Sequence, residues 1–233
     1  MKSDFKKIAI ICASERELAP FLPLIENPVV SEHAMLRIHE GKLNGFDVAA
    51  VYCGVCKVNA AAAAQIMIDA FGADTVISAG ASGGMAEELQ LFDTVVAEEA
   101  CYHDVHARIL TDYHPFMKSQ FFNAAPELAA AARAAAKPLS ESGQRIFFGR
   151  TATGEAFIAD EGRADINARL APLAVDMESA AIAHVCYLNG VRFIAVRCIT
   201  DTATHSGVGT FEENCSRASE IARDFVCAML NEL

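Results

Sequence analysis

The chain has 233 residues, of which 53% are hydrophobic, and a formal net charge of −11 at pH 7. This length suits one domain with a large core, so we expect a single domain over residues 1–233. The acidic balance argues against nucleic-acid binding, and the lack of a run of about 20 apolar residues argues against a membrane span. The N-terminal apolar run is short and soon becomes charged, unlike a signal peptide.

The first half of the chain is predicted to alternate strands with one helix. Residues 7–13 are almost entirely apolar, the pattern of a strand buried on both faces. The Asn44-Gly45 turn signal separates two further runs and predicts a hairpin. The alanine-rich segment 57–71 has apolar residues at helical spacing. The expected strands are 7–13, 35–39, 47–53, 74–79 and 93–98.

The second half continues this alternation. One apolar strand runs into Asp176 and Glu178, and a helix then leads to another apolar strand that ends at Asp201. Segment 107–120 mixes charged and aromatic residues, so we expect a loop that reaches a partner or covers a site. The other expected elements are helices at 126–137, 159–169 and 211–233 and a strand at 145–150.

Strands that alternate with helices predict an α/β fold, with helices on both faces of a parallel or mixed sheet. The sequence has no internal repeat and no linker rich in Pro, Gly or Ser, in agreement with one domain. Strand ends at one edge of such a sheet are a natural place for a polar substrate.

Acidic residues stand at or after the ends of three predicted strands. Asp176 and Glu178 follow one strand, Asp201 ends the next, and Glu17 comes soon after the first. Buried carboxylates are unfavourable unless they are paired or used in chemistry, so these residues are candidates for a substrate site. The alternative is that they cap helices and turns. For the segment around Glu17 taken alone, that alternative is the better one.

Residues 79–85, AGASGGM, form a glycine-rich segment after a predicted strand. A loop of this kind would bring main-chain N–H groups close to a ligand. The segment is neither a dinucleotide fingerprint nor a P-loop, because it lacks the required glycine spacing and a following Gly-Lys-Ser/Thr. Glycines that only turn the chain are the alternative.

Eight scattered cysteines, several inside apolar runs, are typical of reduced thiols in a cytoplasmic protein. Cys53 and Cys56 form a CxxC motif before a predicted helix, whose N-terminus should lower the pKa of at least one thiol and make it sensitive to oxidation. Buried, unreactive thiols are the alternative. No second pair completes a zinc site, and the histidines match no established spacing, so we expect no metal. The histidines considered are His103 and His106, in a segment that also contains Asp104, and His114 further along the chain.

Seven segments, taken together and in order, resemble the nucleoside phosphorylase/hydrolase superfamily, and most closely its 5′-methylthioadenosine/S-adenosylhomocysteine nucleosidase branch. The segments are KIAIICASERE, CGVCKVNAAAA, VISAGASGGM, DTVVAEEACYHDV, TGEAFI, VDMESAAIAHV and FIAVRCITDTA. The resemblance implies a three-layer α/β/α sandwich around a twisted mixed sheet. It also implies a homodimer that needs no cofactor and hydrolyses an N-glycosidic bond, giving adenine and a 5-alkylthioribose for methionine salvage.

The resemblance assigns catalytic roles to residues of this chain. Glu17 would activate the attacking water, and Arg197 would help to hold it. Glu178 would bind the ribose hydroxyls and stabilise the ribosyl cation, and Asp201 would hold N7 and N6 of adenine and support protonation of the base. These roles fit the chemistry, because positive charge develops on the sugar and negative charge on the base. An acid that protonates N7 needs a raised pKa, which burial provides.

The resemblance also implies substrate contacts. Phe157 would stack near adenine, and Ile158 would offer main-chain contacts to its edge. Met177 would pack under the sugar, Val55 would line the sugar side, and Phe211 would lie near the 5′ substituent. The other residues implied to bind substrate are Ser82, Gly83, Asp176 and Thr200.

A purine or uridine nucleoside phosphorylase of the same fold is the main alternative. Phosphorylases of the superfamily bind phosphate with arginines after the first strand and before the glycine segment, where this chain has ASERE and VISAGASGG. Glu17 would repel a phosphate dianion, which favours a hydrolase. Arg16 is the one nearby cation that could turn inward.

Several departures from the family pattern leave the 5′ group and the base open. A nucleosidase that acts on aminodeoxyfutalosine or 5′-deoxyadenosine is one alternative, and a non-catalytic nucleoside sensor or storage protein is another. The presence of all three carboxylates argues against the sensor. Segment 107–113 lacks the Val and Phe that usually reach across the dimer. The other departures are Ser14, Ala81-Ser82, Cys56, Glu155 and Asp176.

Overall fold

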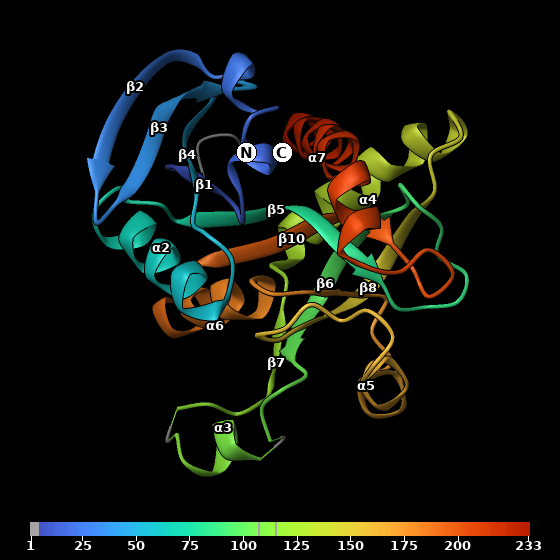
Figure 1. The fold of residues 1–233 in the computed structure, drawn as a ribbon. Coiled ribbons are helices and arrows are strands. Elements are labelled where there is room, and N and C mark those ends of the chain that lie inside the picture. Colours follow the sequence, from blue (N-terminus) through green and yellow to red (C-terminus); the bar gives the residue numbers. More distant parts are fainter. Residues whose placement is uncertain (1–4, 107, 115) are drawn as a thin grey trace.

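The computed structural model describes residues 5–106, 108–114 and 116–233, which form one mixed sheet with helices on both faces (Figure 1). The strands are β1 (Ile8–Cys12), β2 (Glu26–His33), β3 (Leu36–Leu43), β4 (Phe46–Tyr52), β5 (Thr75–Gly84), β6 (Thr94–Tyr102), β7 (Phe121–Asn123), β8 (Ile146–Thr153), β9 (Ala174–Asp176) and β10 (Arg192–Asp201). The helices are α1 (Glu15–Leu18), the 3-10 helix η2 (Leu22–Leu24), α2 (Lys57–Asp69), α3 (Ile109–Asp112), α4 (Pro126–Glu141), α5 (Arg163–Leu170), α6 (Ser179–Asn189) and α7 (Val208–Asn231). None of these helices is long and apolar enough to cross a membrane.

The sheet has the strand order β10-β6-β8-β9-β5-β1-β4-β3-β2, with β7 paired to β6. Because β10 also pairs with β5, the strands β5, β9, β8, β6 and β10 close into a ring, from which the other strands extend. β1 is parallel to both β4 and β5, whereas β6 is antiparallel to β10. The predicted α/β fold with a mixed sheet is confirmed.

β1 shows how the two apolar cores are built. Ile8 and Ile10 face a core that contains α4 and α7, and Ala9 and Ile11 face a second core that contains α2 and α6 (Figure 1). Successive residues of a strand point to opposite faces of the sheet. A strand covered by helices on both faces must therefore be apolar throughout, which explains the unbroken apolar run and gives the expected three layers.

The glycine segment at 79–85 is not the loop that we expected. β5 continues through it as a strand and pairs with β10 along its length and with β9 near its end. A Cβ at Gly80 would lie 2.1 Å from Oε1 of Glu17, and a Cβ at Gly83 would lie 3.0 Å from Oδ2 of Asp201. The glycines therefore allow carboxylates to approach the strand closely and do not form a turn.

The hairpin predicted at Asn44-Gly45 is confirmed. β3 and β4 are antiparallel on either side of it, and Asn44 and Gly45 have φ angles of 51° and 84°. Positive φ at both central residues is what a type I′ hairpin turn requires. β2 was not expected, because this edge strand is exposed along most of its length and has no alternating apolar pattern.

The described residues of segment 107–120 lie beyond the edge of the sheet (Figure 1). Helix α3 of this segment lies beyond β7 at one end of the molecule (Figure 1), where Leu110 packs against the second apolar core. Ala107 and Pro115, which belong to this segment, lie outside the described residues. Tyr113 and Phe116 are 84% and 75% exposed, so the segment presents aromatic surface.

Candidate active site

A cavity of about 280 Å³ lies where several strands end. The ends of β5, β9 and β10 line it, together with segments that follow β1, β4 and β8 and the first turn of α7. All of the predicted site residues line this cavity except Arg197 and Thr200, which instead contact the lining residues Asp176 and Asp201. The full lining is Ala13, Ser14, Glu17, Val55, Ala81, Ser82, Gly83, Ala156, Phe157, Ile158, Val175, Asp176, Met177, Glu178, Asp201, Val208, Phe211 and Glu212.

Glu17 is buried in α1, with its two carboxylate oxygens in different surroundings. Oε2 accepts hydrogen bonds from the main-chain N of Ala13 at 2.9 Å and of Ser14 at 2.8 Å, and from Oγ of Ser14 at 3.1 Å. This is one half of a capping box, whose other half is the bond from Glu17 N to Ser14 Oγ. Oε1 accepts a 2.7 Å hydrogen bond from Ala81 N. Glu17 thus caps its helix with one oxygen and holds the other against β5.

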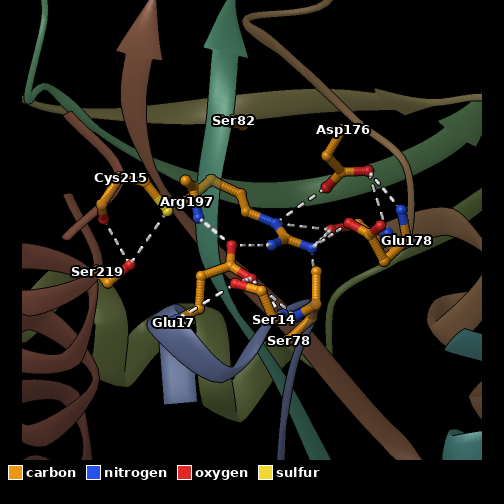
Figure 2. A network of polar contacts seen from close by, with 12 residues as sticks. Ser14, Glu17, Ser78, Ser82, Asp176, Glu178, Arg197, Cys215 and Ser219 are labelled. Carbon is orange, nitrogen blue, oxygen red and sulfur yellow. Dashed lines mark hydrogen bonds and ion pairs between the residues drawn. The ribbon is translucent and has the colours of Figure 1, made fainter. Parts of the chain in front are cut away.

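Arg197 lies at the centre of the polar network (Figure 2). Its Nε is 2.9 Å from Oδ2 of Asp176, and its Nη2 donates to Oγ of Ser78 at 2.9 Å and of Ser179 at 3.0 Å. Nη1 lies 3.9 Å from Oε1 of Glu17 and has no hydrogen-bond partner in the described part of the chain. One buried guanidinium is therefore fixed on one side and presents Nη1 to Glu17 on the other.

Asp176 holds Arg197 in place and organises the start of α6. Its Oδ1 accepts hydrogen bonds from Oγ1 of Thr153 at 2.6 Å, from Glu178 N at 3.2 Å and from Ser179 N at 3.1 Å. Both carboxylate oxygens are thus engaged within the protein, although the residue also borders the cavity.

Glu178 is buried at the N-terminus of α6, facing both α2 and Arg197. Oε1 accepts a 3.0 Å hydrogen bond from Cys56 N, and Oε2 lies 3.8 Å from Nη2 of Arg197. Burial raises the pKa of Glu178 to about 8; Arg197 opposes this rise, and the carboxylates of Asp176 and Glu17 add to it. A positive charge that develops nearby would favour the ionised form.

Asp201 ends β10 and is fully buried. Oδ1 accepts a 2.9 Å hydrogen bond from Oγ1 of Thr200, whereas Oδ2 has no partner among the described residues. Burial raises the pKa of Asp201, and the Thr200 hydroxyl and Arg163 oppose this rise. A buried carboxyl with one unused oxygen is suited to exchange a proton or hydrogen bond with a ligand.

Arg163, in the first turn of α5, is a buried cation that the sequence analysis missed. Nη1 donates to the main-chain oxygen of Gly84, and Nε donates to that of Ala159 at 3.0 Å. Nη2 has no hydrogen-bond partner in the described structure. Arg163 therefore ties α5 to the end of β5 and adds positive charge near Asp201. An arginine in a short polar helix usually faces solvent, so the sequence carried little signal for it.

Apolar side chains form the remaining walls. The rings of Phe157 and Phe211 meet edge to face, with centroids 6.1 Å apart. Val55 and Val208 are partly exposed, which places them at the mouth of the cavity. The sequence analysis did not predict the lining residues Ala13, Ala81, Ala156, Val175 and Val208, because small apolar side chains carry no chemical pattern. It also did not predict Ser14 and Glu212, which are common polar residues at or near the start of a helix.

The expected activation of the Cys53–Cys56 pair is wrong. Burial raises the pKa of Cys53 to about 12, and burial together with Glu155 also raises the pKa of Cys56. Carboxylates occupy two N–H groups at the N-terminus of α2: Cys56 N donates to Glu178 at 3.0 Å, and Lys57 N donates to Glu155 at 3.1 Å. Both thiols therefore favour the protonated, unreactive form.

The His103-Asp104 pair supports the segment that precedes Phe157. Asp104 accepts hydrogen bonds from Lys57 Nζ at 2.8 Å and from Glu155 N at 2.9 Å. The His103 ring packs against Gly154, where a Cβ would lie 2.2 Å from the ring. Across residues 5–106, 108–114 and 116–233, no group of three His, Cys, Asp or Glu side chains is arranged to hold a metal ion.

The family model described as the phosphorylase superfamily matches residues 7–231. A curated relative from Chromohalobacter salexigens, named 5′-methylthioadenosine/S-adenosylhomocysteine nucleosidase, is 32% identical over 98% of this chain and 98% of its own. The solved structure of a nucleosidase of that name from Colwellia psychrerythraea, in complex with adenine, is 33% identical. It has a TM-score of 0.89 and covers 98% of this chain and 96% of its own.

A second kind of solved structure is also similar. The futalosine hydrolase of Helicobacter pylori is 25% identical, with a TM-score of 0.86, and covers 98% of both chains. The fold is therefore shared by nucleosidases with different names.

Proposed function

The chain belongs to the phosphorylase superfamily, and we propose that it hydrolyses the N-glycosidic bond of 5′-methylthioadenosine and S-adenosylhomocysteine. The products are adenine and the 5-alkylthioribose, as methionine salvage requires. The observation that carries this proposal is the meeting of Glu17, Glu178 and Asp201 in one cavity, with Arg197 beside the two glutamates.

Glu17 is the proposed general base. Its Oε2 is taken by three donors of the capping segment, so Oε1 is the oxygen that can accept a proton. Nη1 of Arg197, 3.9 Å away, can donate to the same water that Oε1 deprotonates. Because both side chains are buried and fixed, the water would be oriented before the sugar cation forms.

The carboxylates stabilise the sugar cation. Glu17, Asp176 and Glu178 surround the single charge of Arg197, so the site carries excess negative charge when Glu178 is ionised. Such charge is strengthened in a buried site and opposes the positive charge of a ribosyl cation. Glu178 also accepts the ribose hydroxyls, and Val55 and Met177 pack on the sugar.

Asp201 assists departure of the base. The buried Oδ2 of Asp201 has no hydrogen-bond partner among the described residues and is therefore free to contact the base. The raised pKa of Asp201 favours the protonated form, which can donate a proton to N7 of adenine. Thr200 orients the carboxyl through Oδ1. Phe157 supplies a stacking surface for the base, Ile158 offers main-chain contacts to its edge, and Ser82 and Gly83 also line the cavity.

Water, and not phosphate, is the proposed nucleophile. Arg16 binds Glu212 at 2.7 Å, and no lysine or arginine is among the residues that line the cavity. A phosphate dianion would meet the carboxylates of Glu17, Asp176 and Glu178, and the guanidinium beside them, that of Arg197, already faces all three. The similarity to a futalosine hydrolase keeps a 5′ group other than alkylthio as the second candidate.

We also propose a homodimer, one domain and a cytoplasmic location. The exposed Tyr113 and Phe116 favour burial against a second copy of the chain. One domain is supported by α7, which packs with β1 in the same core. All eight cysteines are free, as in a reducing compartment.

Product analysis tests the proposed reaction. The protein would be incubated with methylthioadenosine, adenosylhomocysteine, adenosine and inosine, with and without phosphate, and the bases and sugars separated by chromatography. We expect adenine and a free thioribose from the first two substrates at a rate independent of phosphate. Release of no base from any of the four would favour the nucleoside sensor.

A further inference from the structure

An ion pair stands at the mouth of the cavity and takes no part in the proposed chemistry. Nη1 of Arg16 lies 2.7 Å from Oε2 of Glu212 and also donates to the main-chain oxygen of Glu212 at 3.1 Å. Glu212 lines the cavity, and Arg16 is held next to the cavity by its ion pair with Glu212. The side chains are 44% and 53% exposed, so each keeps polar surface for a further partner.

The ion pair lies next to two residues that we expect to contact the sugar and its 5′ substituent. Arg16 is adjacent to Glu17 in α1, and Glu212 is adjacent to Phe211 in α7. Under the proposed function Glu17 faces the sugar, so a substituent on the 5′ carbon would leave the cavity between α1 and the first turn of α7. Phe211 and the exposed Val208 offer apolar surface to a thioether along this route.

We propose that Arg16 and Glu212 form a subsite for a zwitterionic α-amino-acid group carried by the 5′ sulfur of the substrate. The guanidinium would bind the carboxylate and Glu212 would bind the ammonium, an arrangement in which each charge meets its opposite. The inference rests on the proposed function and adds to it a basis for distinguishing adenosylhomocysteine from methylthioadenosine.

Because the subsite carries one positive and one negative side chain, it favours a zwitterionic substituent over other 5′ substituents. A methylthio group gains nothing from either charge. A substituent that carries only a carboxylate would be attracted by Arg16 but repelled by Glu212, so the pair selects against it. Binding energy that is remote from the reacting bond and unchanged in the transition state appears mainly in KM.

Steady-state kinetics test the subsite through one ratio, kcat/KM for adenosylhomocysteine divided by kcat/KM for methylthioadenosine. We expect Arg16→Gln and Glu212→Gln each to lower this ratio about tenfold, through KM for adenosylhomocysteine. Arg16→Lys keeps the charge and should retain most of the ratio. Glu15→Gln and Glu213→Gln, exposed neighbours that do not line the cavity, are matched controls that should leave it unchanged.

Two further measurements separate charge recognition from disturbance of α1. The wild-type ratio should fall as NaCl rises from about 50 to about 500 mM, because partly exposed charges are screened. With 5′-S-(3-carboxypropyl)thioadenosine, which lacks the ammonium, Glu212→Gln should no longer reduce kcat/KM. A ratio that neither Gln variant changes, in a protein that cleaves methylthioadenosine, overturns the subsite and leaves the proposed function standing. Cleavage of neither substrate by the wild type overturns both.

Discussion

Nη1 of Arg197 and Oε1 of Glu17 lie 3.9 Å apart, too far for a direct hydrogen bond and close enough for one water to bond both atoms. The rest of the guanidinium is fixed by Asp176, Ser78 and Ser179, so the separation is set by β5, β9 and α6 and not by a mobile side chain. This relationship supports the base function that we propose for Glu17, which its capping role alone would not require.

Glu17→Gln should lower kcat on the order of 10²-fold or more, because the variant cannot accept the proton of the attacking water. Glutamine still provides one acceptor oxygen for the capping box, so the fold should persist. Circular dichroism and thermal unfolding check the fold, and adenine release from methylthioadenosine measures kcat. Glu15→Gln on the same helix is the control. Near-normal turnover in folded Glu17→Gln would remove the base assignment.

Asp201→Asn should lose turnover to a similar extent, on the order of 10²-fold, because an amide cannot pass a proton to N7. The pKa of Asp201 is raised by burial, and an acid catalyst must be protonated, so wild-type kcat should fall as pH rises through that pKa. Thr200→Val removes the hydroxyl that opposes the rise and should shift this alkaline limb to higher pH. An alkaline limb that is the same in Thr200→Val would contradict this role.

Glu178 should make the free protein less stable at high pH. Its folded-state pKa of about 8 lies above the ordinary value of 4.5, so the folded state holds the proton more tightly than the unfolded state. The free energy of unfolding therefore falls as pH rises from 4.5 to about 8. Glu178→Gln should flatten this decrease, and Glu213→Gln should not. Urea unfolding at several pH values in this window measures the difference; parallel curves for wild type and Glu178→Gln would refute the claim.

Gly80→Ala should abolish most of the activity by displacing the catalytic pair. The added Cβ would lie 2.1 Å from Oε1 of Glu17 and 2.9 Å from Nη1 of Arg197, and a shift of about 1 Å in catalytic groups can reduce the rate about 10²-fold. Gly72→Ala is the control: it has φ of 72° and no atom within 4 Å of the added Cβ. It should reduce stability by about 1 kcal/mol and leave kcat unchanged. Full activity in Gly80→Ala would show that the strand adjusts.

The segment 107–120 should mediate dimerisation through its exposed aromatic side chains. Light scattering of the wild type at micromolar concentration should give twice the chain mass, and the double variant Tyr113→Glu/Phe116→Glu should give the monomer mass. Val58→Glu, which changes an exposed apolar residue of α2, is a control for added charge. A wild-type monomer would contradict the proposal.

Most of the fold follows from local patterns that the sequence makes visible. Buried β1 and the Asn44-Gly45 hairpin were predictable because apolar periodicity and turn chemistry are properties of short segments. The prediction of a loop at 79–85 was wrong. These glycines make room for Glu17 and Asp201, which approach from distant parts of the chain and leave no local pattern. β2 was not predicted, because an exposed edge strand buries neither face and therefore has no alternating apolar pattern.

The site was predictable where the family motifs name a residue, and the residues named in this way line the cavity except for Arg197 and Thr200. Resemblance placed Glu17, Glu178 and Asp201 together, whereas the support of Arg197 comes from side chains on separate elements and has no local pattern. Arg163 was missed for the same reason. The cysteine prediction failed because a helix N-terminus was considered without the carboxylates that occupy it.

The central claim is that water attacks the sugar at the Glu17–Arg197 pair, and isotope labelling tests it most directly. The protein would be incubated with methylthioadenosine in water enriched in ¹⁸O, with inorganic phosphate also present, and the sugar product analysed by mass spectrometry. The account predicts a free methylthioribose that carries one ¹⁸O atom, at a rate that phosphate does not change. A methylthioribose 1-phosphate without the label would contradict it and identify the chain as a phosphorylase.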